Sequence, residues 1–271
     1  HLFDNKTYKK KDMWKTSNGR WRHPFRHPGK VYKTLDSLWK EDRQINDLAK
    51  KYILSADVIA ITIGGSELWR NPNTKLGYTT IPFPDVFNDQ MPNIAEVYTL
   101  TFQEHLDCLD FIYKTIRRVN PKAELIFTVS PHRMTFTVSE KDVVQATCQG
   151  KSTIRTAVGE FTDRIKENAS YFHSYEIVEY AEYPELFYDS DFRHVNRFAI
   201  EVVMNEFIRL FANSELYNEN DYSKIATMYK DKKNILAIQE IVKEQKQKFN
   251  VIDAVNRVKK AILLFLLVFK K

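Results

Sequence analysis

An aspartate and a histidine three residues apart, Asp191 and His194, lie in the segment YDSDFRHVN. A carboxylate at this spacing can reach the Nδ1 atom of the imidazole, fix its tautomer and leave Nε2 free to take a proton from a hydroxyl. The same spacing also suits an aspartate that caps a helix beginning near His194, with the imidazole at the surface. Spacing alone leaves the catalytic and the structural interpretation open.

Two further segments carry groups that could contact a ligand. In TIGGSELW, Gly64 and Gly65 offer backbone N–H groups and Ser66 offers a hydroxyl, which together suit either an oxyanion hole or a tight turn after a strand. In TVSPHR, Ser130 and His132 are too close in sequence to form a catalytic pair by themselves. His132 is interpreted as a pocket residue or as a structural histidine.

The sequence provides no support for a metal site or a cofactor. His23 and His27 are four residues apart, but Pro24 and Pro28 prevent the helix that would place both imidazoles on one face. Neither the phosphate-loop pattern nor the dinucleotide-binding glycine pattern occurs. The two cysteines are too few for a disulfide framework or a cysteine-rich zinc site and suit a reducing compartment such as the cytoplasm.

The candidate residues follow segments that have the character of β-strands. Strands are predicted at residues 56–65, 124–131 and 171–180, and the first, ADVIAITIGG, is apolar enough to predict burial on both faces. Apolar residues at helical spacing predict helices at residues 34–53, 94–119, 139–169 and 194–212.

This alternation of strands and helices predicts right-handed crossovers and a parallel sheet covered by helices, an α/β fold of three layers, α/β/α. Ligands bind beyond the carboxyl ends of the strands in such sheets. We therefore expect three segments to meet there, at residues 64–67, 130–133 and 189–194.

Charge divides the chain into three parts. Residues 1–50 carry 13 Lys and Arg against 6 acids, and residues 214–271 carry 12 against 7, so the net charge of +6 leaves −6 for the centre. An acidic centre disfavours a nucleic-acid interface, and the basic ends are interpreted as solvated surface. The predicted organisation is an α/β domain at 1–213 with an irregular N-terminal arm at 1–32, followed by a basic helical extension at 214–271.

The extension ends in AILLFLLVF, residues 261–269, which is too short to span a bilayer. No transmembrane span is therefore expected. This apolar run is interpreted as a helix end that is buried or packed against a partner.

Four blocks between residues 14 and 212 form a pattern more specific than any single motif: W…NGRWRHPFRHP, SADVIAITIGGSELWRN, NPKAELIFTVSPHRMTFTVSEKDVVQATCQGKSTIRTAVGEF and YFHSYEIVEY…FYDSDFRHVN. In this order they resemble the GSCFA family, a branch of the SGNH/GDSL-type hydrolases. The resemblance implies an SGNH/flavodoxin-like fold, a nucleophilic serine after the first strand and a terminal Asp–x–x–His loop. Asp191 and His194 match that loop.

The sequence also departs from the family pattern. The namesake Gly-Ser-Cys-Phe-Ala segment, which carries the serine upstream of these blocks, does not occur in it. We therefore expect an N-terminally incomplete fold without the first strand and the nucleophile, and self-association through the exposed sheet edge or the C-terminal helices. Gly65 and Ser66 replace the family's Leu-Thr, and Ser66 is the nearest counterpart of the asparagine in the wider SGNH pattern.

The resemblance implies an ester hydrolase or acyl transferase that acts on a small-molecule or carbohydrate ester. His194 would act as general base and then acid, Asp191 would orient it, and Gly64, Gly65 and Ser66 would stabilise the oxyanion. The alternative is a non-catalytic relative that keeps a carbohydrate-binding or partner-binding cleft.

Overall fold

The computed structural model describes residues 3, 8–26, 29–79, 82–86 and 94–211. They belong to two compact units, one formed by residues 1–130 and 134–173 and the other by 131–133 and the residues from 174 onward. The predicted extension at 214–271, with its apolar run, lies outside the described residues, and so does His27.

The first unit contains both strands and helices, in the order η1 (Lys10–Asp12), β1 (Trp14–Lys15), β2 (Trp21–Arg22), α1 (Leu35–Ser55), β3 (Val58–Ile63), β4 (Glu67–Arg70), β5 (Glu96–Thr99), α3 (Phe102–Val119), β6 (Glu124–Val129), α4 (Val143–Ile165) and β7 (Ala169–Phe172). The second unit contains α5 (Ser174–Glu179), η2 (Pro184–Phe187) and α6 (Arg197–Phe211). Within the part of the chain that is described, no helix has both the length and the apolar character needed to cross a membrane.

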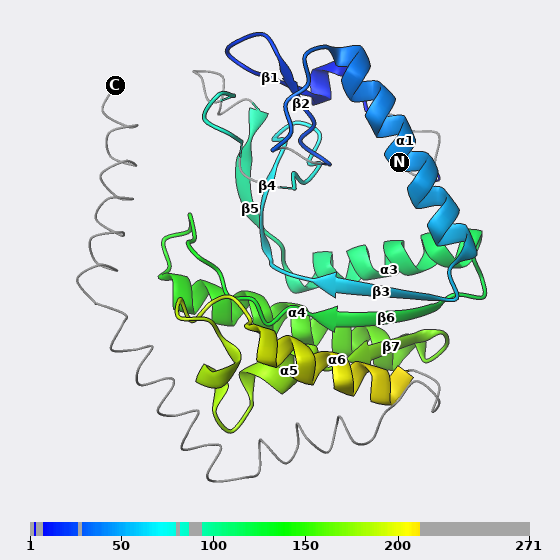
Figure 1. Cartoon of the computed structure of the whole chain (residues 1–271), viewed down its shortest axis with the longest axis vertical. Coiled ribbons are helices and arrows are strands. Elements are labelled where there is room, and N and C mark those ends of the chain that lie inside the picture. The colour runs from blue at the N-terminus through cyan, green and yellow to red at the C-terminus, as the bar shows by residue number, and fades with distance from the viewer. Residues whose placement is uncertain (1–2, 4–7, 27–28, 80–81, 87–93, 212–271) are drawn as a thin grey trace. The chain divides into compact units, whose positions relative to one another are not determined.

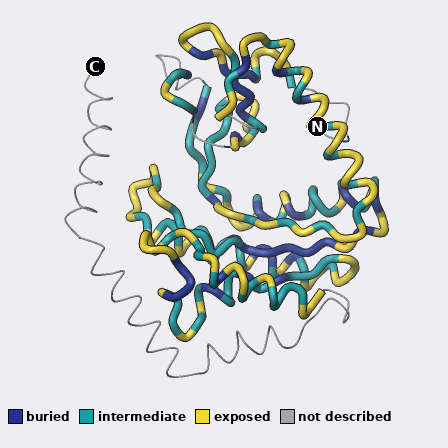
Figure 2. Tube along the Cα trace, viewed as in Figure 1, coloured by how far each residue is buried: buried dark blue, intermediate teal, exposed yellow. Residues whose placement is uncertain are grey.

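A three-stranded parallel sheet in the order β3-β6-β7 organises the first unit (Figure 1). The central strand β6 is buried along nearly its whole length (Figure 2). Its Phe127 ring meets the ring of Phe161 from α4 edge-on, with the centroids 5.3 Å apart, and both side chains are fully buried. Helices flank the sheet, with α4 on β6 and β7 and α3 against α4. The α/β class with a parallel sheet, predicted from the sequence, is confirmed.

Strand β3 forms as predicted, but its predicted burial is wrong. Exposed residues alternate with partly buried ones along β3, and Val58 is 52% exposed. Among the described strands β3 pairs only with β6, so it lies at an edge of the sheet. Apolar composition predicted burial on both faces, whereas the period-two exposure shows that one face of β3 is not covered by the described residues.

Two predicted elements change character partway along. The predicted helix at 94–119 begins only at Phe102, where Thr101 and Glu104 cap each other, and the residues before it form β5, antiparallel to β4. The predicted strand at 171–180 ends at Phe172 and is followed by helix α5. Val178 of α5 is fully buried in the core of the second unit, so tertiary packing overrides the strand-like composition.

The N-terminal arm is less irregular than predicted. Strands β1 and β2 pair antiparallel, and the rings of Tyr8 and Phe25 stack with their centroids 4.6 Å apart. Arg22 lies between its ion-pair partner Asp85, 2.9 Å away, and the ring of Phe83, whose centroid is 4.3 Å from the guanidinium carbon. Aromatic packing therefore holds the arm.

Candidate functional site

The Asp–x–x–His loop of the second unit is closed by its own backbone. The Asp189 N–H donates to the His194 carbonyl and the Phe192 N–H donates to the Asp189 carbonyl, both at 2.8 Å. Tyr188 and Val195 pair as an antiparallel bridge on either side of the loop. Phe192 adopts a φ of 54°, a left-handed conformation that is uncommon for a residue with a side chain. The loop is therefore a tight turn that fixes the direction of His194.

Within this turn, Asp191 uses both of its carboxylate oxygens. Oδ1 accepts hydrogen bonds from the backbone N–H groups of Arg193 and His194, both at 2.9 Å. Oδ2 pairs with the imidazole Nδ1 of His194. The backbone bonds hold the carboxylate in place, so the interaction with the imidazole does not depend on a freely rotating side chain.

Asp191 does not cap the following helix. Helix α6 begins at Arg197, and the Asn196 side chain accepts the hydrogen bond from the Ala199 N–H at 3.0 Å. The Nδ2 group of Asn196 also donates to the carbonyl of Leu186 at 2.7 Å. The cap of α6 is therefore Asn196 and not Asp191, so that part of the structural interpretation is wrong, while its surface imidazole agrees with the 51% exposure of the His194 side chain.

Electrostatics keep Asp191 in its charged form. Burial alone raises the pKa of the carboxyl, but the hydrogen bonds from His194 and from the Arg193 backbone outweigh it and hold the pKa at about 2. Because this pKa lies below the ordinary value of 3.8, the pairing stabilises the fold at neutral pH and is lost only as the pH falls toward 2. Both side chains are about half exposed, at 44% and 51%, so solvent keeps this stabilisation small.

The other imidazole nitrogen of His194 is an acceptor. The NH1 group of Arg193 lies 2.8 Å from Nε2. A guanidinium can only donate, so the tautomer that satisfies both contacts has its proton on Nδ1, facing Asp191, and an acceptor at Nε2. The same NH1 group is 3.2 Å from Nδ1, but that contact is no hydrogen bond because Nδ1 is itself protonated.

His132 lies beside His194 in the second unit. The two imidazole rings meet edge to face, with centroids 4.6 Å apart and an interplanar angle of 79°. The structure therefore brings one of the sequence-predicted pocket residues to the Asp–x–x–His loop.

Arg133, which sequence reasoning missed, holds the Asp–x–x–His loop in place. Its guanidinium binds both carboxylate oxygens of Glu179, at 2.9 and 3.0 Å, and donates to the Phe192 carbonyl at 3.3 Å. It also stacks over the ring of Tyr188, whose hydroxyl donates to Glu179 at 2.7 Å. Burial and the bond to Glu179 raise the pKa of Tyr188, so the hydroxyl stays a donor. The residue could have been noticed because it directly follows His132 at a predicted strand end.

In the first unit the ends of β3 and β6 lie side by side. The Ser130 N–H donates to the Ile63 carbonyl at 2.9 Å, which places Gly64 next to Ser130. Gly64 and Gly65 are exposed, neither has a positive φ, and a Cβ added to either would meet no heavy atom within 4 Å. The fold itself does not require glycine at these two positions, which leaves space for a ligand beside the backbone.

Ser66, in contrast, is buried, with 3% of its surface exposed. Its hydroxyl donates to the Gly150 carbonyl at 3.2 Å, and Nε2 of His105 lies 3.0 Å from the same oxygen. Burial lowers the pKa of His105, so its ring is neutral at pH 7. In this structure Ser66 is positioned as an anchor of the Gly64–Ser66 segment.

Sequence reasoning also missed Lys151. This lysine of α4 is 4% exposed, and its Nζ donates to the carbonyl of Gly64 at 2.5 Å and to that of Ser130 at 2.6 Å. A signal was present, because Lys151 shares its helical spacing with the buried residues Ile154 and Val158. A lysine on the apolar face of a helix has to find acceptors, and here these are the ends of two parallel strands.

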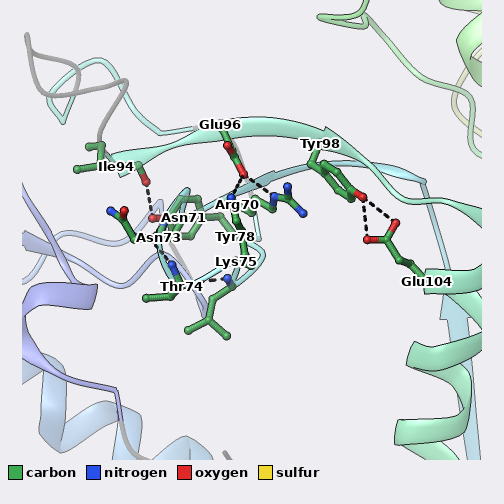
Figure 3. Close-up of polar contacts among 11 residues, drawn as sticks. Arg70, Asn71, Asn73, Thr74, Lys75, Tyr78, Ile94, Glu96, Tyr98 and Glu104 are labelled. Atoms are coloured by element: carbon green, nitrogen blue, oxygen red, sulfur yellow. Dashed lines mark hydrogen bonds and ion pairs between the residues drawn. The ribbon is translucent and has the colours of Figure 1, made fainter.

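The strand pair that follows Ser66 is tied to helix α3 (Figure 3). Arg70 of β4 donates to Glu96 of β5 at 2.7 Å, and its guanidinium carbon lies 3.3 Å from the centroid of the Tyr98 ring. The Tyr98 hydroxyl donates to Glu104 in the first turn of α3, at 2.8 Å. The β4–β5 pair therefore connects one end of the Gly64–Ser66 segment to the helix that carries His105.

The sequence-predicted site residues form two groups in the structure. Gly64, Gly65 and Ser66 lie with Ser130 in the first unit, at the ends of β3 and β6. His132 lies with Asp191 and His194 in the second unit. That both groups serve one site stays a prediction.

Comparison with protein-family models gives a match. The sequence model of the GSCFA family matches residues 1–207, which include the N-terminal arm, the parallel sheet and the Asp–x–x–His loop. A comparison with curated proteins finds no match.

Proposed function

The chain belongs to the GSCFA family, and on this premise we propose that it is an SGNH-type ester hydrolase or acyl transferase. The observation that carries the proposal is the geometry of Asp191 and His194. The carboxylate is held by two backbone N–H groups and binds Nδ1, while Nε2 is an unprotonated acceptor. This is the arrangement that lets an imidazole accept a proton from a hydroxyl nucleophile.

The proposed reaction has two halves. A serine oxygen attacks the acyl carbon of the ester as its proton passes to Nε2 of His194, and the imidazolium then protonates the oxygen of the departing alcohol. Water, or a second alcohol in a transferase, attacks the acyl-serine in the same way and returns the proton to the serine. Asp191 stabilises the imidazolium that forms in each half.

Other residues have proposed roles in binding. The exposed backbone of Gly64 and Gly65 is the proposed source of N–H donors to the oxyanion, with Ser66 holding that segment. Ser130 and His132 are proposed to contact the substrate. The family resemblance supports a carbohydrate O-acyl ester as the substrate class, and the nucleophilic serine is left for experiment to assign.

Two measurements on one sample test this proposal. We expect the protein to hydrolyse a fluorogenic acetyl ester, and we expect a fluorophosphonate, which labels activated serines, to block that hydrolysis. Mass spectrometry of the labelled peptide would then identify the nucleophile. Heat-denatured protein is the control for background labelling. A folded sample that neither hydrolyses the ester nor takes the label overturns the proposal for this chain, and binding of carbohydrate without turnover supports a non-catalytic module instead.

We also propose that the chain self-associates through the exposed edge of β3. Val58 is 52% exposed at this edge, and the outer side of β3 has no partner strand among the described residues. Val58→Lys is expected to shift the protein toward monomer in sedimentation velocity, because a charge disfavours edge-to-edge pairing. Val144→Lys, a matched change at a 74% exposed valine of α4, is the control.

A different result would locate the contact elsewhere or exclude it. A protein that is monomeric at every concentration contradicts the proposal. Association that survives Val58→Lys but is lost on deletion of residues 214–271 moves the interface to the C-terminal extension.

A further inference from the structure

Helix α4 holds the Gly64–Ser66 segment at both of its ends. Lys151 donates to the carbonyl of Gly64 at 2.5 Å, and the neighbouring Gly150 carbonyl accepts the hydroxyl of Ser66 at 3.2 Å. The backbone of α4 approaches closely, since a Cβ added to Gly150 would lie 3.5 Å from the Ser66 oxygen. Gly65 lies between these two anchors and is itself exposed.

The bond from Lys151 determines where the Gly65 N–H points. The described peptide bonds are all trans, and in a trans peptide the N–H of one residue points opposite to the carbonyl of the residue before it. Because the Gly64 carbonyl points toward Nζ of Lys151, the Gly65 N–H points away from the lysine. This N–H has no hydrogen-bond partner within the described part of the chain.

The anchor also joins two strand ends. Lys151 is 4% exposed, and the same Nζ binds the Ser130 carbonyl at 2.6 Å, which ties the ends of β3 and β6 together. A buried side chain that donates to two carbonyls fixes the direction of both. The exposed side of the Gly64–Gly65 peptide therefore presents the N–H and not the carbonyl.

We infer that Lys151 is a positioning residue for oxyanion stabilisation: it holds the Gly64–Gly65 peptide so that the Gly65 N–H faces the substrate as a preset donor. This inference rests on the proposed ester chemistry. A donor fixed before the reaction stabilises the tetrahedral oxyanion without reorganisation, whereas a peptide free to rotate would present its carbonyl part of the time.

The test compares Lys151→Met with Lys151→Arg. Lys151→Met removes the donor to both carbonyls at similar volume, and Lys122→Met, the same change at an exposed lysine two residues before β6, is the control. We expect Lys151→Met to lower kcat for acetyl-ester hydrolysis by about a hundredfold with KM changed by less than about threefold. Lys151→Arg, which keeps the charge and the donors, is expected to recover most of the loss.

A second readout does not require turnover. In amide NMR spectra, Lys151→Met is expected to shift the Gly65 signal strongly, while Lys122→Met leaves it in place. Wild-type protein titrated with acetate, the carboxylate product, is expected to show its largest amide shift at Gly65. This measurement needs no variant, so it tests the exposed Gly65 donor even if Lys151→Met does not fold.

The possible results separate the two proposals. A folded Lys151→Met variant with the kcat and the Gly65 signal of the Lys122→Met control overturns the inference, and so does an acetate titration that leaves Gly65 unmoved. A wild-type protein without hydrolysis or fluorophosphonate labelling overturns the ester chemistry instead. In that case a shifted Gly65 signal in Lys151→Met would still establish the orienting role of the lysine.

Discussion

His194→Ala is expected to lower kcat for acetyl-ester hydrolysis by about 10⁴-fold or more, because the variant has no group that can accept the proton of the nucleophile. The melting temperature should hardly change. The His194 side chain is 51% exposed, so its removal leaves no cavity and costs few apolar contacts. Steady-state kinetics and thermal melting of the same preparation give both results.

The neighbouring histidine provides the control. His132→Ala removes the imidazole whose ring centroid is 4.6 Å from that of His194, but it leaves the Asp191–His194 pair intact. We expect this variant to lose no more than about tenfold in kcat/KM, the size of a positioning effect. Equal losses in the two variants would contradict the assignment of His194 as the single base.

The parallel sheet and the Asp–x–x–His turn each have a signal within a short stretch of sequence, which is why both could be predicted. Strand β6 is mostly apolar because both of its faces are buried, and a carboxylate three residues before a histidine can reach Nδ1 when the chain turns tightly between them. Both signals are local in sequence. The edge position of β3 is not, since it depends on which strands lie beside it rather than on its own residues.

The residues that sequence reasoning missed act over long sequence separations. Lys151 binds the carbonyl of Gly64, 87 residues earlier in the chain, and Arg133 binds Glu179, 46 residues later. No spacing rule connects such pairs, because the fold has to form before the partners meet. The sequence signal for Lys151 was its place in the apolar helical spacing of α4. The signal for Arg133 was its position next to His132.

These long-range contacts share one consequence. Lys151 fixes the direction of a peptide at a strand end, and Arg133 donates to the carbonyl of Phe192, the residue with the left-handed φ between Asp191 and His194. Lys151 and Arg133 therefore each donate to a backbone carbonyl, and each holds the backbone at or next to a candidate site residue. The candidate residues could be picked out in the sequence, whereas the side chains that hold their backbone in place could not.

Asp191→Asn is expected to lower kcat by about 10⁴-fold although it preserves the shape of the turn. The asparagine oxygen can still accept from the backbone N–H groups of Arg193 and His194, as Oδ1 does in the wild type. Its amide, however, would donate to Nδ1, which moves the imidazole proton to Nε2 and leaves no acceptor for the hydroxyl. Asp189→Asn makes the same change of charge two residues earlier and is expected to keep most of the activity.

The pH dependence of this defect distinguishes orientation from a simple charge effect. With a pKa of about 2, Asp191 remains ionised from pH 4 upward, so its own titration contributes no limb to a pH–rate profile in that range. The wild-type profile should therefore contain no titration of Asp191 between about pH 4 and pH 9. A fall in the wild-type rate toward pH 4 that is absent in Asp191→Asn would show that Asp191 takes up a proton there, contrary to the tight pairing with His194.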